Sequence, residues 1–419
     1  MLSTDQNAAL AMLEHFLNSE QNEVVLTGKP GTGKTYILKH LLKDKKAVTL
    51  TATTNKALEC LKSSFNNSNN YNFSTIHNAL GLIVMNNYIN DTQKLVRRRT
   101  SNVTGILVID ECSMIDEELM LYIQELKNCK IIYVGDKNQL PPVKGRNPIF
   151  GRVPEVELST VHRQANESGI KIISDSFRDM IQVGKYNWDI NSNKDVTVIT
   201  DPDVASNIIT DLYNSLEYLD NPNNIRTLCY TNKKVNNYNK FIRDNSKLFH
   251  GLLGNYLDSF PSVGETVVVN KPYLPTTSSI RLNTEDTFKV INREDVEVTI
   301  PTTGNPININ AIKITTNEGP VLYLKNKDDI DLYRSIIKDL KSMSKNNKTH
   351  YRSLTTLKEM FIDIRPIHAQ TVHKSQGSTY KNVFIDYKDL MKCRDLAIRA
   401  RLFYVAISRA SEHVYIYAE

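Results

Sequence analysis

The sequence has few cysteines and no long apolar run. Its five cysteines are scattered, and none belongs to a Cys-x-x-Cys pair: Cys60, Cys112, Cys129, Cys229 and Cys393. Neither a disulfide framework nor a zinc site is therefore indicated, and a reducing compartment fits this usage. No apolar stretch approaches the length of a membrane span, and Asp5 and Glu14 lie where a leader would be basic and apolar. We expect a cytoplasmic, unprocessed protein that contacts no membrane.

Strong charge and internal repeats are also missing. The formal net charge is +6 over 419 residues, and 40% of the residues are hydrophobic. This mildly basic balance suits a polyanionic partner but is also common among proteins that bind none. A chain of this length has room for roughly two to four domains. Composition alone therefore indicates an ordinary globular protein and leaves its partner open.

A glycine-rich loop lies between a short apolar run, 24–26, and a helical pattern, 36–42. In such a strand, loop and helix, backbone N–H groups cradle phosphate oxygens, while a lysine and a hydroxyl reach the outer phosphates and Mg²⁺. A plain Gly/Pro turn would leave the flanking strand and helix as a coincidence. The loop therefore predicts a nucleoside triphosphate site. Its predicted phosphate-binding residues are Gly28, Pro30, Gly31, Thr32, Gly33, Lys34 and Thr35.

Two later apolar runs end in polar residues suited to hydrolysis. The run 106–109 is followed by Asp110 and Glu111. The first acid can hold Mg²⁺ together with Thr35, and the second can orient or deprotonate the attacking water. Gln139 follows another apolar strand and can sense the γ-phosphate. An Asp-Glu pair at a strand end is often only a solvated turn, but the upstream loop favours a catalytic pair.

Apolar runs alternate with helical patterns along most of the chain, which predicts parallel sheets covered on both faces. Two groups of runs predict two α/β domains, the second beginning near residue 180. Residues 82–104 break the alternation as a hairpin or loop insertion. An all-β insertion is predicted over 262–330, with strands at 267–269, 287–291, 296–300, 311–315 and 321–324. Helices are predicted over 330–361, with a break at 345–348.

The order of these motifs resembles that of superfamily 1 DNA helicases. The phosphate loop, Asp110-Glu111-Cys112-Ser113 and 135–142 resemble motifs I, II and III. Further matches are 371–378 with motif V, 404–410 with motif VI, Gln6 and Ala9 with the Q motif, 74–77 with motif Ib, Arg163 with motif IV and 230–233 with segment IVa. Together they span nearly the whole chain in the family's order.

Within that superfamily the chain most resembles the 5′→3′, RecD-like branch, superfamily 1B, and especially its small Dda-type phage members. The chain is short, a small insertion follows 74–77, and the β insertion lies where this group carries an SH3-like domain. The helices at 330–361 match the tower of the Dda type. The segment 51–56 departs from motif Ia, because it lacks the Pro and the His that pack on DNA in this group.

The resemblance implies an α/β fold of two RecA-like P-loop NTPase domains, 1A and 2A. A small hairpin insertion, the pin or domain 1B, interrupts the first domain, and an SH3-like β and helical tower insertion, domain 2B, interrupts the second. The implied boundaries are 1–81 and 105–180 for domain 1A, 82–104 for 1B, 181–261 and 365–419 for 2A, and 262–364 for 2B.

The same resemblance implies an ATP-dependent DNA helicase that translocates 5′→3′ on single-stranded DNA and unwinds duplex in viral replication or recombination. The implied catalytic residues are Lys34, Asp110, Glu111, Gln139, Arg163 and Arg409, the two arginines acting as arginine fingers. Gln6, Gln376 and Gly377 join the nucleotide site. The implied DNA contacts are Thr51, Thr53, Asn55, His77, Asn232, Thr371 and His373, with Tyr88 as the strand-separating pin residue.

The implied cofactors are ATP and Mg²⁺, and the implied partners are single-stranded and forked DNA. A single-strand-binding protein or a replisome component is a further candidate partner. The resemblance also implies a monomer in the cytoplasm, that of a host bacterium if the chain is phage-encoded.

Other functions stay open from the sequence. The motor motifs alone also suit an RNA helicase, or a translocase that displaces bound proteins without efficient unwinding. A nucleotide kinase or GTPase explains only 24–35 and Asp110. A nonenzymatic single-strand-binding module gives no purpose to the phosphate loop or the carboxylate pair.

Overall fold

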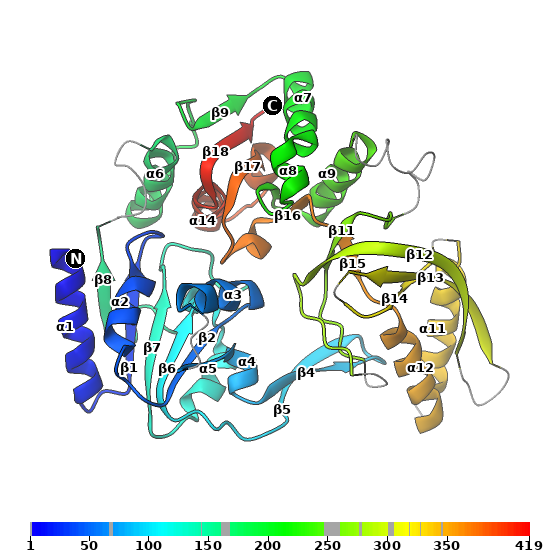
Figure 1. Ribbon diagram of the computed structural model, residues 1–419, viewed down its shortest axis with the longest axis horizontal. Coiled ribbons are helices and arrows are strands. Elements are labelled where there is room, and N and C mark those ends of the chain that lie inside the picture. Colours follow the sequence, from blue (N-terminus) through cyan, green and yellow to red (C-terminus); the bar gives the residue numbers. More distant parts are fainter. Residues whose placement is uncertain are drawn as a thin grey trace. The chain divides into compact units, whose positions relative to one another are not determined.

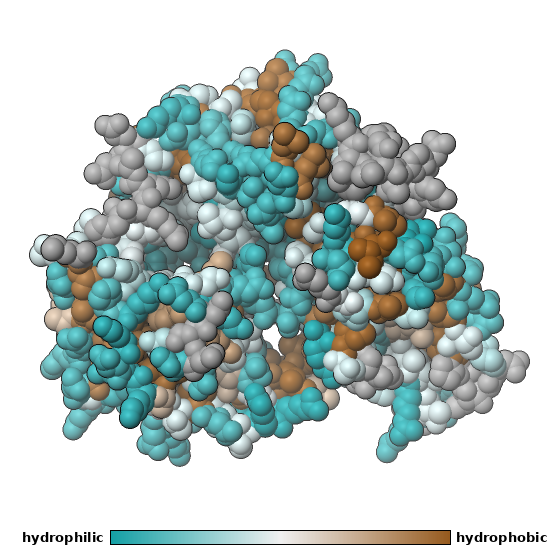
Figure 2. Space-filling view, in the orientation of Figure 1, coloured by the Kyte–Doolittle hydropathy of each residue, from teal (hydrophilic) through white to brown (hydrophobic). Residues whose placement is uncertain are grey.

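The computed structural model describes residues 2–66, 70–143, 145–160, 168–246, 260–275, 279–300, 306–317, 319–326, 328–344 and 347–419. It contains two compact units, which we call the first and second units. The first unit consists of Met1–Ile83, Arg97–Ile242 and His368–Glu419, and the second of Val84–Val96 and Arg243–Ile367. Figure 2 shows hydrophilic residues over most of the visible face, with the apolar residues in separate patches. In the described part of the chain, none of the helices has the length and apolar character that crossing a membrane requires.

The first unit holds a six-stranded parallel sheet in the order β3-β2-β6-β7-β1-β8 (Figure 1). Its strands are β1 (Glu23–Gly28), β2 (Val48–Ala52), β3 (Asn72–Thr75), β6 (Gly105–Asp110), β7 (Cys129–Gly135) and β8 (Glu155–Leu158). The associated helices are α1 (Thr4–Asn18), α2 (Lys34–Leu42), α3 (Asn55–Ser64), α4 (Ile76–Ala79) and α5 (Glu117–Gln124). The four central strands are largely buried apolar runs, as predicted for a parallel sheet covered on both faces. The edge strands β3 and β8 are short and carry polar residues, so their sequences gave no strong strand signal.

A second, five-stranded parallel sheet in the first unit has the order β16-β10-β17-β18-β9. Its strands are β9 (Val196–Ile199), β10 (Ile225–Cys229), β16 (Ala369–Thr371), β17 (Tyr380–Asp386) and β18 (Ala410–Tyr417). Its helices are α6 (Gly169–Val183), α7 (Pro202–Asn214), α8 (Leu216–Asp220), α9 (Asn232–Asp244), α13 (Tyr387–Met391) and α14 (Leu396–Ser408). Two parallel sheets with helices agree with the predicted α/β fold.

α6 packs into the core of the second sheet. Ile170, Ile173 and Phe177 of α6 lie in the same buried cluster as α14, and the Phe177 ring stacks on that of Phe403 with centroids 5.0 Å apart. The predicted boundary between residues 180 and 181 falls inside this helix. Because the apolar face of α6 belongs to the second core, the two cores divide before Gly169.

The second unit contains an antiparallel sheet in the order β14-β13-β12-β11-β15. Its strands are β11 (Thr266–Val269), β12 (Thr287–Ile300), β13 (Ile307–Thr316), β14 (Leu322–Lys325) and β15 (Ile364–Pro366). The prediction of separate strands at 287–291 and 296–300 was wrong. The charged residues between them stay in β12 because they pair with β13, as in Arg293 opposite Ile314, after an irregularity at Val290.

Two helices of the second unit follow this sheet, α11 (Ile330–Ser344) and α12 (Lys348–Met360). They confirm the predicted helical pair; of the predicted break at 345–348, residues 345 and 346 lie outside the described residues, and Lys348 begins α12. The described end of the break is Asn347, whose side chain caps α12 by accepting a hydrogen bond from Thr349 N.

The predicted hairpin is present as β4 (Leu82–Asn87) paired with β5 (Thr92–Arg97). At its base, Gly81 has a φ of +68° and its carbonyl accepts a hydrogen bond from Arg98 N at 2.8 Å. A Cβ on Gly81 would lie 2.2 Å from the Arg99 carbonyl oxygen. Only glycine therefore fits the point where the chain enters the hairpin.

We expect Gly81→Ala to destabilise the protein by about 3 kcal/mol, since a left-handed conformation and a backbone clash act together. Gly184→Ala is the matched control, because Gly184 has a similar φ of +72° but open space around its Cα. The free energy of unfolding of Gly184→Ala should fall by only about 1 kcal/mol. Urea denaturation followed by circular dichroism measures both, and equal losses would contradict the steric role of Gly81.

Candidate active site

A cavity of about 880 Å³ lies beside the phosphate loop in the first unit. Residues from both parallel sheets line it. The first sheet and its helices contribute, among others, Gln6, Pro30, Gly31, Gly33, Lys34, Thr35, Asp110, Glu111 and Gln139. The second contributes Gly377 and the turn 408–411, which includes Arg409. The structure thus brings most of the predicted nucleotide-site residues together around one cavity.

The phosphate loop directs the start of α2 at this cavity. Gly33 is the residue before α2 and has a φ of +88°, and a Cβ there would lie 2.4 Å from Gln6 Nε2. Gln6 Nε2 donates to the carbonyl of Thr32 at 3.1 Å, so Gln6 also braces the loop. The Lys34 ammonium donates to the carbonyls of Gly28 and Lys29 at 2.7 and 3.0 Å. The free N–H groups at a helix start suit an anion.

Gln6 is held in place by the local structure of α1. Ser3 caps this helix by accepting from Gln6 N, and Ser3 N in turn donates to Gln6 Oε1 at 3.1 Å. This reciprocal capping box fixes the glutamine side chain, which is only 4% exposed.

The two acids at the end of β6, Asp110 and Glu111, line the cavity. Burial raises the pKa of Asp110. Burial, and then the neighbouring Asp110, raise the pKa of Glu111 to about 7, while Arg409 and Lys34 act in the opposite direction. Glu111 also has a φ of +54°, a costly conformation for a residue with a side chain. Its Oε2 atom is buried and has no hydrogen-bond partner among the described residues.

Arg409 approaches the same cavity from the end of α14. Its guanidinium donates to the carbonyls of Val405 and Ser378 at 3.2 and 3.1 Å and to Ser408 Oγ at 3.1 Å. It is 5% exposed and forms no ion pair within the described ranges. These contacts orient the group without neutralising it, so its charge is available to a phosphate.

The predicted nucleotide-site residue Gln376 has a different position. Gln376 is buried and donates to the Leu140 carbonyl at 3.3 Å and to Gln139 Oε1 at 3.5 Å, and it does not line the cavity. Gly377, the next residue, lines the cavity. Arg163, the second predicted arginine finger, lies outside the described residues.

The predicted DNA contacts form two groups at the carboxyl ends of parallel strands. Thr51, Thr53, Asn55 and His77 follow or end β2 and β3, whereas Asn232, Thr371 and His373 follow or end β10 and β16. Polar side chains at such strand ends are well placed for ligands.

The individual side chains of these groups differ in access. The Thr51 hydroxyl is fully buried and donates to the Val108 carbonyl at 2.7 Å, and Thr371 caps a short helix through Lys374 N. Asn232 is exposed. Burial lowers the pKa of both His77 and His373, so both rings are neutral near pH 7.

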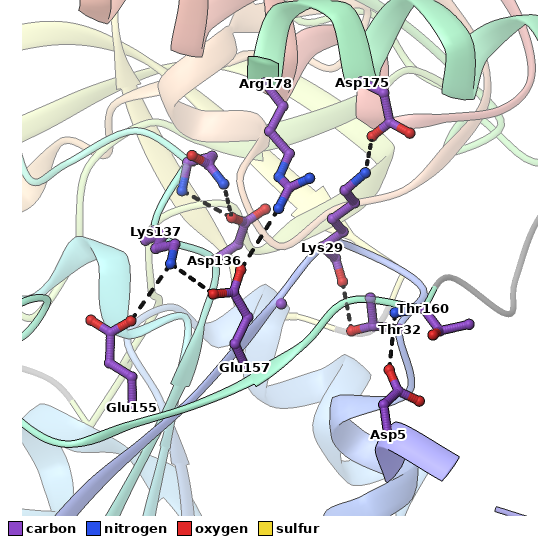
Figure 3. Close-up of polar contacts among 12 residues, drawn as sticks. Asp5, Lys29, Thr32, Asp136, Lys137, Glu155, Glu157, Thr160, Asp175 and Arg178 are labelled. Atoms are coloured by element: carbon purple, nitrogen blue, oxygen red, sulfur yellow. Dashed lines mark hydrogen bonds and ion pairs between the residues drawn. The ribbon is translucent and has the colours of Figure 1, made fainter. Parts of the chain in front are cut away.

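Several contacts around the site carried no sequence signal. The Lys29 ammonium reaches Asp175 of α6 at 2.5 Å, Arg178 approaches Glu157 at 3.7 Å, and Glu157 also pairs with Lys137 (Figure 3). They connect the phosphate loop and β8 with α6, over 146 residues in the case of Lys29 and Asp175.

A buried carboxylate also organises the second group of predicted DNA contacts. Asp389 is 0% exposed and accepts from Tyr230 N, Thr231 N and the Thr231 hydroxyl at 2.7 to 2.9 Å. It fixes the turn before Asn232. The sequence signal was an acid shortly after an apolar strand, which is too common to single out.

Comparison with known proteins matches both ends of the chain. Residues 1–186 match the family model described as an AAA domain, and residues 366–417 match that of a UvrD-like helicase C-terminal domain. The chain is 24% identical to the ATP-dependent DNA helicase dda of Enterobacteria phage T4, with 99% of this chain and 98% of that protein covered. It is 25% identical to the uncharacterized protein R530 of Acanthamoeba polyphaga mimivirus, with 99% of both covered.

A shorter match and two solved structures point the same way. Over 29% of the chain, identity to the RecBCD enzyme subunit RecD of Buchnera aphidicola is 36%, covering 23% of that subunit. A structure of two coordinating Pif1 helicases on forked duplex DNA has a TM-score of 0.53 at 16% identity, covering 99% of this chain and 92% of that one. A Bacteroides Pif1 helicase with ADP-AlF3 and single-stranded DNA has a TM-score of 0.50 at 17% identity, with the same coverage.

The structures support the two-domain RecA-like fold. By its two domain matches and its relatives, the chain is similar to the superfamily 1B, RecD-like ATP-dependent DNA helicases, and over its full length to a small Dda-type member.

Proposed function

We propose that this chain uses ATP hydrolysis to translocate 5′→3′ along single-stranded DNA and to separate the duplex ahead of it. The observation that carries the proposal is the cavity shared by the phosphate loop, the acid pair and Arg409. Since its two walls come from two α/β cores, closing around a triphosphate and opening after hydrolysis would move one core relative to the other.

The residues around the cavity divide the chemistry of hydrolysis among them. Lys34 and Arg409 would compensate the charge that spreads over the phosphate in the transition state. Glu111 would orient or deprotonate the attacking water. Thr35 and Asp110 would hold Mg²⁺. Glu111 Oε2, which has no hydrogen-bond partner in the part of the chain that the structure describes, fits a site built for a cation and its water shell. When bound, Mg²⁺ would neutralise negative charge on the phosphates.

The DNA strand would contact the two groups of residues at the carboxyl ends of the strands. Exposed Asn232, and the neutral imidazoles of His77 and His373, can hydrogen-bond phosphates without reading sequence. The ring centroids of His373 and Tyr230 are 6.2 Å apart. The Tyr230 ring offers a face on which a base could stack. Alternating grip by the two groups during cleft closure would give directed movement.

The hairpin β4–β5 is the candidate for strand separation, and α11 and α12 of the second unit hold its tip. Asp91 forms ion pairs with Lys341 of α11 and Lys358 of α12. Tyr88 packs on the apolar cluster that β12 and β13 form with these helices, and it donates to Glu359 Oε1 at 3.1 Å. These contacts favour Tyr88 as an anchor of the hairpin and not as the wedge. Val84 and Met85 of β4 are 39% and 54% exposed and are better placed to meet a base pair.

Lys34→Ala should lower the ATP hydrolysis rate on the order of 10³-fold, because the outer phosphates lose their fixed positive charge. The measurement is steady-state release of phosphate at saturating single-stranded DNA. Lys43→Ala serves as the control, since Lys43 is an exposed residue at the other end of α2. A Lys34→Ala protein that hydrolyses ATP normally would refute the assignment of this cavity.

Unwinding should require a 5′ single-stranded tail. Duplexes with a 5′ tail, a 3′ tail or no tail, mixed with the protein and ATP, give the polarity directly when strand release is followed by fluorescence. Release from the 3′-tailed duplex alone would reverse the proposed direction. Strong DNA-stimulated hydrolysis without release from any duplex would indicate a translocase that displaces bound proteins.

Asp91→Ala should lower the unwinding rate several-fold, by about 1 kcal/mol in barrier, and leave hydrolysis on single-stranded DNA unchanged. Lys341 and Lys358 would lose their shared ion-pair partner, so the hairpin tip would be held less firmly when it meets the duplex. Asp331→Ala is the control, because Asp331 also pairs with a basic side chain, Arg334, but within one turn of α11. Equal unwinding rates for the wild type, Asp91→Ala and Asp331→Ala would rule out that the ion pairs of Asp91 brace the hairpin tip.

A further inference from the structure

The loop 136–140, which carries Gln139, is attached to the first sheet through β7 but is packed into the core of the second. Leu140 is 0% exposed and belongs to the same buried cluster as Tyr404 and Val405 of α14 and Leu228 of β10. A residue that precedes α6 in the chain is thus a core residue of the second parallel sheet.

Polar contacts from the second sheet's elements fix the rest of this loop. The Tyr404 hydroxyl donates to the Asp136 carboxylate at 2.5 Å, and the two residues are 1% and 2% exposed. The Arg401 guanidinium donates to the carbonyls of Lys137 and Gln139 at 2.5 and 2.7 Å. These bonds involve a charged group at one end, which makes them stronger than neutral ones.

The loop also keeps two kinds of local contact. The second Asp136 oxygen accepts from Asn138 N at 2.9 Å, which sets the turn before Gln139. The Lys137 ammonium pairs with Glu157 and Glu155 of β8 at 2.9 and 3.7 Å, as Figure 3 shows. The loop therefore touches both sheets, but its buried anchors come from elements of the second: α14, and Gln376 after β16.

α14 places a second residue at the same cavity. Arg409 follows the last residue of this helix and lines the cavity, as Gln139 does. The helix is buried from Leu402 to Ile407, so it is a rigid element that can bend or slide little on its own. Gln139 and Arg409 are consequently fastened to one helix, although they arise from two different sheets.

We infer that Tyr404 and Arg401 are positioning residues that make Gln139 and Arg409 respond to the bound triphosphate as one body. The inference rests on the proposed function, because it assigns these residues to the same hydrolysis reaction. We call the hydrogen bonds from Tyr404 and Arg401 to the loop 136–140 the clamp. Loss of the clamp would leave nucleotide binding intact and would misplace Gln139 in the transition state. The expected result is a fall in kcat with little change in KM.

Tyr404→Phe tests the hydroxyl alone. We expect kcat for ATP hydrolysis to fall about tenfold, with KM for ATP within about twofold of the wild type. Tyr213→Phe is the matched control: its hydroxyl is similarly buried and donates at 2.7 Å to the His368 carbonyl, with Tyr213 in α7 and His368 directly before β16. Thermal melting of both variants shows whether their losses of stability are similar.

Arg401→Met provides a second, independent test, because it removes the bonds to two carbonyls and keeps an apolar stem. If Tyr404 and Arg401 hold the same loop, kcat of the double variant, Tyr404→Phe with Arg401→Met, should be only slightly lower than kcat of the less active single variant. A Tyr404→Phe protein that matches Tyr213→Phe in kcat, or losses of kcat that multiply in the double variant, would overturn the inference.

All rates are measured with and without single-stranded DNA. A wild-type protein whose hydrolysis ignores DNA would refute the proposed motor, whereas the comparison of Tyr404→Phe with Tyr213→Phe would still decide the role of the clamp from the DNA-free rates.

Discussion

Two carboxylates buried side by side are unstable unless positive charge lies near them, and the first unit meets this constraint from two directions. Lys34 arrives from the phosphate loop and Arg409 from the end of α14, and both lower the pKa of Glu111 against the effects of burial and of Asp110. The acid pair therefore needs the second core as much as the first. Binding of a triphosphate would add negative charge to this balance, and the cation would restore it.

Much of the fold follows from local sequence patterns. The apolar runs of β1, β2, β6 and β7 stand out because strands buried on both faces need consecutive apolar residues. The phosphate loop and the acid pair are equally local, and the structure places them around one cavity. The full length of β12 and the core to which α6 belongs could not be predicted from local sequence patterns. Cross-strand pairing with β13 keeps charged residues in β12, and packing against α14 decides which core α6 joins.

The site residues that sequence reasoning missed act over long distances in the chain. Asp175, Asp389 and Tyr404 each contact a backbone or side chain more than a hundred residues away. No spacing rule links such partners, because the fold alone brings them together. Tyr88 shows the same limit: an aromatic residue in a hairpin suggests an exposed wedge, but only the three-dimensional structure reveals that α11 and α12 cover it.

The burial of Leu140 bears on how this protein can change over evolutionary time. Exchanging a whole RecA-like half between relatives would leave either a hole in the second core or an ill-fitting side chain, since that core includes a residue encoded with the first half. Exchange is tolerated only if the loop 136–140 travels with α14. The two halves of this enzyme therefore form separate sheets, but the loop 136–140 and α14 constrain each other's side chains.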